Sequence, residues 1–246
     1  AGRTRWDIVA VAFLAGVVCG AQIGKVPPAL PILREELALG FITAGWVASL
    51  VNFCGALLGV TVGLAVDRIG ARRFIASSLA LLALGGAYGA LAETGTDMLI
   101  SRFLERVGLV GTVVAAPTLI RAACQPADRN LALGIWGSYL PTGMVASLVI
   151  APWVMQHIGW RGLWWSNVAL AALFTVLVMV WLSPRNWSGP VVASGRGVPR
   201  PALLDTLRRP GPWLFALCFL LYALMFYAVA IWLPSFLLET KGWTLA

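Results

Sequence analysis

Apolar residues are gathered into seven long runs along the chain, separated by short segments rich in charge, glycine or proline. The runs cover residues 6–33, 43–66, 74–92, 98–120, 131–156, 163–182 and 213–238. A helix needs about 20 residues to cross the hydrocarbon core of a bilayer, and these runs are close to that length or longer. The pattern therefore predicts an all-α membrane protein with seven transmembrane helices.

A short charged hairpin, residues 63–73, separates the second run from the third. Gly70 can take the positive φ of a tight turn, and a loop with three arginines is typical of the cytoplasmic side. On a helix, residues spaced by four form one stripe that permits close contact with a neighbour. Here the stripe is Gly55, Gly59, Gly63 and Asp67. The plainer alternative is a basic loop that only orients the protein.

The hairpin pattern Gly-x-x-x-Asp-Arg-x-Gly-x-Arg-Arg resembles the signature loop between the second and third helices of the major facilitator superfamily. The segment 102–108 is similar to the fourth-helix pattern of that family, except that Arg106 stands where a small residue is usual. The resemblance implies a secondary transporter in which the loop clamps two halves together on the cytoplasmic side. The gating residues would be Gly63, Asp67, Arg68, Gly70, Arg72 and Arg73.

The chain also contains the beginning of a repeat. Leu233-Pro234 corresponds to Leu30-Pro31, and both pairs end a long run before a charged segment. In the resembled family, parallel six-helix repeats build two halves with the substrate site between them. We therefore expect a six-helix bundle over 1–182, a cytoplasmic linker over 183–212, and over 213–246 the first helix of a second bundle with the start of the following outer loop. Seven helices of an expected twelve would be present, and the remaining five helices would be partners from the same chain.

The distribution of charge gives the expected orientation. The chain has 18 Lys+Arg against 10 Asp+Glu, and its pI is near 10. Most of the arginines fall at one set of span ends, so the basicity indicates topology and not nucleic-acid binding. We expect a multi-pass protein of the inner (plasma) membrane with a cytoplasmic N-terminus. That orientation argues against a seven-helix receptor. The chain begins with Ala1 and shows no cleavable signal peptide, so we expect an incomplete or processed N-terminus.

Neither a cofactor nor an enzymatic site is expected. The cysteines have no metal-ligand spacing, and we expect no disulfide and no metal. They are Cys19, Cys54, Cys124 and Cys218. No nucleophile or metal set is apparent at a membrane face.

Charged residues within the predicted spans are the main candidates for function, because such residues are costly in a bilayer. Lys25 lies late in the first run, before prolines that should kink or unwind the helix. Arg102, Glu105 and Arg106 lie in the first turns of the fourth run. The alternatives are that Lys25 snorkels to the surface or forms a structural pair, and that the fourth-run group is only a salt-bridge network without substrate contact. Polar and aromatic residues would shape the rest of the site: Gln22, Asn52, Trp136, Tyr139 and Tyr227. Ordinary packing remains an alternative for Trp136 and Tyr139, and helix–helix bonding for Asn52.

Within the predicted spans, three basic residues (Lys25, Arg102 and Arg106) outnumber the one deep acidic residue, Glu105. This balance favours an anionic substrate. Arg102 would be the direct contact, Lys25 a second point charge, and Glu105 the proton site of a symporter. The runner-up is efflux of a drug-like amphiphile by proton antiport, but the Gly-Pro pair of the family's drug antiporters is absent around Pro141. A transporter-like sensor that binds without transporting is the alternative from another class. The expected partners are a small-molecule substrate, protons and the lipid bilayer.

Overall fold

The computed structural model describes residues 3–50, 62, 65–66, 69–183 and 208–241, and for 226–241 it describes the backbone alone. The part described is helical, with turns between the helices. The chain divides into two compact units, residues 1–194 and 195–246. In the second unit, α9 spans Pro210–Lys241.

The first unit is a bundle of long helices. These are α1 (Trp6–Gly24), α2 (Val26–Glu36), α4 (Ala71–Ala90), α5 (Gly95–Ala123), α6 (Arg129–Gly137) and α7 (Tyr139–Trp181). Four stretches of the described residues are long and apolar enough to cross a membrane: Trp6–Gly24, Ala71–Ala90, Gly95–Ala123 and Arg129–Trp181. Phe41–Leu50 and Pro210–Met225 are shorter apolar helices. The predicted all-α membrane fold is thus confirmed.

The break predicted in the first run falls at Lys25, between α1 and α2. Lys25 itself keeps right-handed helical angles, with φ −69° and ψ −23°. Pro27 and Pro28 lie in the first turn of α2, where the missing N–H of proline removes no helical hydrogen bond. The run is therefore interrupted at a single residue and is not extensively unwound.

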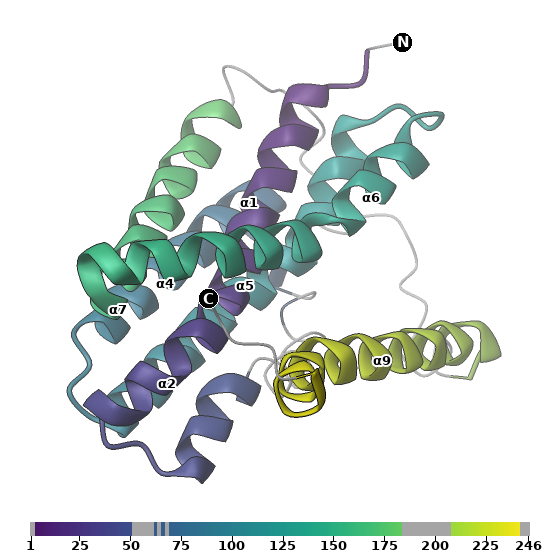
Figure 1. Ribbon diagram of the computed structural model, residues 1–246. Coiled ribbons are helices and arrows are strands. Elements are labelled where there is room, and N and C mark those ends of the chain that lie inside the picture. Colours follow the sequence, from purple (N-terminus) through teal and green to yellow (C-terminus); the bar gives the residue numbers. More distant parts are fainter. Residues whose placement is uncertain (1–2, 51–61, 63–64, 67–68, 184–207, 242–246) are drawn as a thin grey trace. The chain divides into compact units, whose positions relative to one another are not determined.

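The fifth and sixth runs form one hairpin, which α7 makes by folding back on itself (Figure 1). Gly159 alone leaves helical geometry, with φ 69° and ψ 177°, a conformation that favours glycine. The segment between the fifth and sixth runs, residues 157–162, is therefore helical apart from the reversal at Gly159. His157 lies within the helix, where its Nδ1 is 2.7 Å from the carbonyl oxygen of Trp153.

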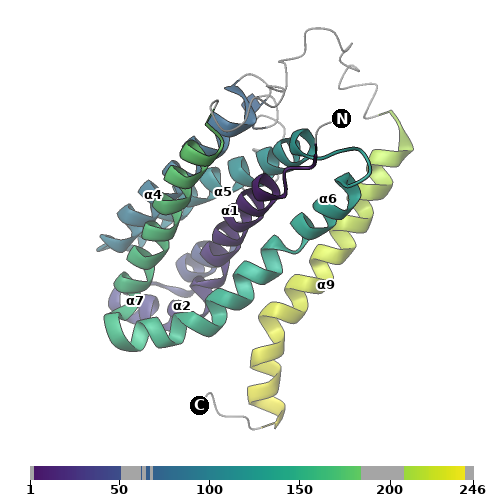
Figure 2. The same cartoon turned by 90° about the horizontal axis from the view of Figure 1, so that it is seen from above.

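Helix α1 packs against α5 and α7, and α4 packs against α5 and α7 (Figure 2). Glycines allow α1 to approach α7 closely. A Cβ on Gly20 would lie 2.9 Å from the carbonyl oxygen of Leu140, and one on Gly24 would lie 2.6 Å from that of Met144. These contacts fix the depth of α1 in the bundle, and so they fix the position of Lys25 at its end.

Polar contacts close the bundle at the end where the N-terminus lies. Asp7 accepts hydrogen bonds from Arg5 at 2.7 Å and from Trp181 at 3.1 Å. The Asp7 carboxylate, as a hydrogen-bond acceptor, raises the pKa of the Arg5 guanidinium above its ordinary value. Arg72 donates to the carbonyl oxygen of Met179 at 2.7 Å. Gly70, with φ 87°, is the N-cap residue just before α4 at this end and has the positive φ predicted for it.

At the opposite end of the bundle, hydrogen bonds join three segments: the end of α2, the bend of α7 and the turn after α4. Glu36, at the end of α2, accepts hydrogen bonds from Trp160 at 2.7 Å and from Arg161 at 3.1 Å. Arg161 also donates to the carbonyl oxygen of Ala92, just beyond α4, at 3.2 Å. Successive connections between the helices therefore lie at alternate ends of the bundle, as expected for helices that cross a membrane one after another.

Candidate functional site

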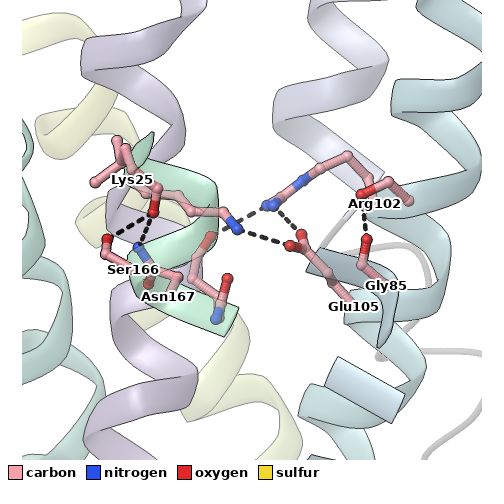
Figure 3. Close-up of polar contacts among 9 residues, drawn as sticks. Lys25, Gly85, Arg102, Glu105, Ser166 and Asn167 are labelled. Carbon is pink, nitrogen blue, oxygen red and sulfur yellow. Dashed lines mark hydrogen bonds and ion pairs between the residues drawn. The ribbon is translucent and has the colours of Figure 1, made fainter. Parts of the chain in front are cut away.

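The charged residues predicted within the spans meet in one buried cluster, shown in Figure 3. Lys25, at the junction of α1 and α2, places its Nζ 2.6 Å from Glu105 Oε1. Arg102 forms an ion pair with the other oxygen of the same carboxylate, Oε2. All three residues are fully buried. Glu105 therefore joins a base from the first span to a base from its own helix.

The spacing along α5 explains the second of these contacts. Arg102 and Glu105 are three residues apart, so they lie one above the other on one face of the helix. Arg102 also donates to the backbone carbonyl of Gln22 at 3.2 Å, which ties α5 to the last turn of α1. Arg106 follows one turn after Arg102 and is also buried. The four ionisable groups of this cluster carry three positive charges and one negative charge, a formal sum of +2.

Two glycines of α4 make room for the carboxylate. A Cβ on Gly85 would lie 2.8 Å from the backbone nitrogen of Glu105, and one on Gly86 would lie 3.3 Å from its Oε1. Ser101 donates a hydrogen bond of 2.8 Å to the carbonyl oxygen of Gly85 (Figure 3). Helices α4 and α5 can therefore approach closely enough to enclose Glu105.

Burial makes these contacts energetically important. Removing one partner of a buried ion pair leaves an uncompensated charge, which typically costs about 3–5 kcal/mol. In this arrangement both Lys25 and Arg102 depend on Glu105 for an opposite charge. A solute anion that binds either base would therefore compete with that carboxylate.

The other predicted site residues make different contacts. Trp136 and Tyr139 stack on each other with ring centroids 4.4 Å apart, and both pack on Gly16 of α1. Gln22 contributes its backbone carbonyl to Arg102, and not its side chain. Gly70, Arg72 and Arg73 lie at the end of the bundle near the N-terminus. Four predicted site residues fall outside the described residues, namely Asn52, Gly63, Asp67 and Arg68, as does the side chain of Tyr227. Gly55 and Gly59 of the predicted stripe also lie outside them.

Sequence reasoning missed Trp164, which completes the cluster. The Lys25 ammonium lies 4.3 Å from the centroid of its ring, and the residue is fully buried on the second arm of α7. The only signal in the sequence is its spacing of four from Trp160, which suggests a shared helix face but no partner.

An apolar crevice lies beside the cluster, between α1 and the two arms of α7. Its volume is about 230 Å³. Most of the residues that line it are aliphatic: Leu14, Val17, Val18, Ala21, Ala146, Ser147, Ile150, Ala151, Val154, Leu163, Ser166, Asn167, Leu170 and Phe174. Ser166 and Asn167 each donate a hydrogen bond to the carbonyl oxygen of Leu163, so their donors are turned to the backbone of their own helix.

Known proteins resemble both the sequence and the fold. Over 235 residues the chain is 24% identical to the 3-(3-hydroxy-phenyl)propionate transporter of Escherichia coli, covering 94% of this chain and 57% of that protein. Over 154 residues it is 28% identical to the tetracenomycin C resistance and export protein of Streptomyces glaucescens, covering 61% of this chain and 28% of that protein. The chain thus spans between about a quarter and three fifths of the length of these relatives.

The fold is similar to the crystal structure of a bacterial homologue of the human lysosomal transporter Spinster, in an inward-facing and unoccupied conformation. The TM-score is 0.74 at 17% identity, over 99% of this chain and 57% of that structure. The sequence profile of the Major Facilitator Superfamily matches residues 12–246. With its apolar spans, its helical bundle and this match over nearly its whole length, the chain is a multi-pass membrane protein that belongs to the major facilitator superfamily.

Proposed function

We propose that this chain forms part of a secondary active transporter that moves a small organic or inorganic anion across the plasma membrane by alternating access. The observation that carries the proposal is the buried contact of Lys25 and Arg102 with Glu105. A site with more positive than negative charge, closed from water, favours an anion and disfavours a cation. The planar fork of Arg102 suits a carboxylate or an oxyanion.

The same geometry suggests how a proton is coupled to the anion. A solute anion that binds Arg102 and Lys25 displaces the Glu105 carboxylate. A buried carboxylate without a partner is unstable when charged, so Glu105 takes up a proton. One negative charge and one positive charge then enter together, and the net charge of the cluster is unchanged. The result is symport of the anion with a proton.

The test is a thermal-shift panel on the full-length transporter with benzoate, inorganic phosphate, tetraethylammonium and a neutral detergent-like amphiphile. We expect an anion to stabilise the protein, and we expect Arg102→Gln and Lys25→Gln to reduce that effect. Uptake of the stabilising anion into proteoliposomes then separates a transporter from a sensor that only binds. Stabilisation by the cation alone, unaffected by either substitution, would eliminate the proposal.

Efflux of an amphiphile is the second candidate, and the apolar crevice beside α1 favours it. Its volume exceeds the roughly 150 Å³ of an apolar cavity that accommodates benzene. The tetracenomycin C relative is named for resistance and export. In this alternative the charges of the cluster pair only with one another, and Ala146→Phe in the crevice reduces binding of the neutral amphiphile while Arg102→Gln does not.

A further inference from the structure

The Lys25 ammonium is held between a carboxylate and an aromatic face. Its Nζ is 2.6 Å from Glu105 Oε1 and 4.3 Å from the centroid of the Trp164 ring. Lys25 and Trp164 are both fully buried. A cation over the face of tryptophan is attracted by the negative side of the ring quadrupole, and this attraction is largest where water is excluded.

The surroundings of Trp164 fix the orientation of this face. A Cβ on Gly89 of α4 would lie 2.8 Å from the indole Nε1 and 3.0 Å from Cδ1, so this glycine makes room for the edge of the ring. Trp160 packs against Trp164 edge to face, with centroids 5.6 Å apart and planes at 89°. Trp160 is in turn fixed by its hydrogen bond to Glu36.

The indole N–H does not explain why a tryptophan is present. A buried tryptophan usually donates its N–H to an acceptor. In the part of the chain that the structure describes, Nε1 of Trp164 is buried and has no hydrogen-bond partner. What the residue gives to the cluster is therefore the face of its ring.

We propose that Trp164 is a positioning residue for Lys25, with an indole face that holds the lysine as a buried cation while Glu105 exchanges its partners. This rests on the proposed function in one respect only, namely that Glu105 leaves Lys25 during transport. At that moment Lys25 has lost the carboxylate beside it, and the ring remains as the neighbour that favours an ammonium. Lys25 then stays in place for the incoming anion.

The test compares an aromatic and an aliphatic residue at position 164, in the presence and in the absence of the lysine charge. The variants of the full-length transporter are Trp164→Phe and Trp164→Leu, each alone and each combined with Lys25→Met. The matched control is Trp153→Leu on the first arm of α7, which removes an exposed ring that lies tilted against His157. The readouts are the thermal unfolding midpoint and, separately, KM and the maximal rate of anion uptake.

We expect Trp164→Phe to stay close to the wild type and Trp164→Leu to unfold at a clearly lower temperature. With Lys25→Met this difference between Phe and Leu should vanish, because no cation remains over the ring. Where uptake is measurable, Trp164→Leu should raise KM about tenfold or more, the effect of losing one desolvated cation–π contact. Trp153→Leu should change none of these quantities.

An equal difference between Phe and Leu with and without the lysine charge would overturn the proposal, since Trp164 would then be packing alone. If Lys25→Met cannot be recovered in folded form, fluorinated tryptophans introduced at position 164 replace it. They weaken the ring quadrupole with little change of shape, so stability should fall with each added fluorine, and a flat series would overturn the proposal. Both stability measurements remain informative if the protein transports no anion.

Discussion

At the residue scale, the cluster has one acid among the residues that the structure describes. Glu105 contacts Lys25 from the first span and Arg102 from its own helix, and all three side chains are closed from water. Exposed pairs elsewhere in the bundle differ in kind. The ion pair of Glu36 with Arg161 has side chains that are 48% and 46% exposed, so water and salt screen it.

This contrast predicts the cost of two matched substitutions. Glu105→Gln in the full-length protein should lower the free energy of unfolding by about 3–5 kcal/mol, because two buried bases lose their opposite charge. Glu36→Gln should lower it by less than about 1 kcal/mol. Denaturant titration in micelles measures both, and equal effects would contradict the closed cluster described here.

At the element scale, glycines determine how closely the helices pack. Gly20, Gly24 and Gly143 bring α1 against α7 with almost no space between the backbones. Gly85 does the same between α4 and α5, and Gly86 faces the side chains of Val168 on α7 and of Glu105. The close approach of these helices encloses the charges, since a bulkier residue at any of these positions meets a neighbouring atom at 3.3 Å or less.

Substitution of Gly143 by valine tests this packing. A Cβ at this position would meet the backbone of α1, including the nitrogen of Ala21 at 2.8 Å. Overpacking of this kind costs about 1–3 kcal/mol, so we expect a lower thermal unfolding midpoint. The control is Gly134→Val on α6, where a Cβ meets nothing within 4 Å. If Gly134→Val lost as much stability as Gly143→Val, the helix propensity of valine, and not a steric contact, would be responsible.

At the scale of the whole molecule, the basic residues mark one end of the bundle. Arg72 and Arg73 lie in the first turn of α4, at the end where the N-terminus lies. Arg121 in the last turn of α5 and Arg129 at the start of α6 lie at the same end. Lys and Arg next to spans favour the cytoplasmic side. We therefore expect this end of the bundle, with the N-terminus, to face the cytoplasm.

Cysteine labelling in intact cells tests that orientation. On a background without the four native cysteines, Glu93→Cys should react with a membrane-impermeant maleimide added outside. Arg121→Cys should react only in inside-out vesicles. Both original residues are exposed and lie at opposite ends of α5. Labelling of Arg121→Cys from outside would reverse the topology.

The sequence alone determined the helical membrane class, the approximate spans and the family, because hydropathy over about 20 residues and a local loop pattern suffice for these. It also predicted the chemistry-bearing residues Lys25, Arg102 and Glu105, since charge within a span is conspicuous. Only the tertiary structure decided which of them meet. Lys25 and Glu105 are 80 positions apart, and periodicity along one helix says nothing of the neighbour that it faces.

The same reason accounts for what the sequence left open. The choice between lining and packing for Trp136 and Tyr139 depended on Gly16, which lies on another helix. Trp164 had no local signal of its contact with Lys25. The segment between the fifth and sixth runs, residues 157–162, reverses the chain at Gly159 alone, because one glycine with positive φ is enough. Contacts between distant segments arise from packing, and the packing exists only once the helices are assembled.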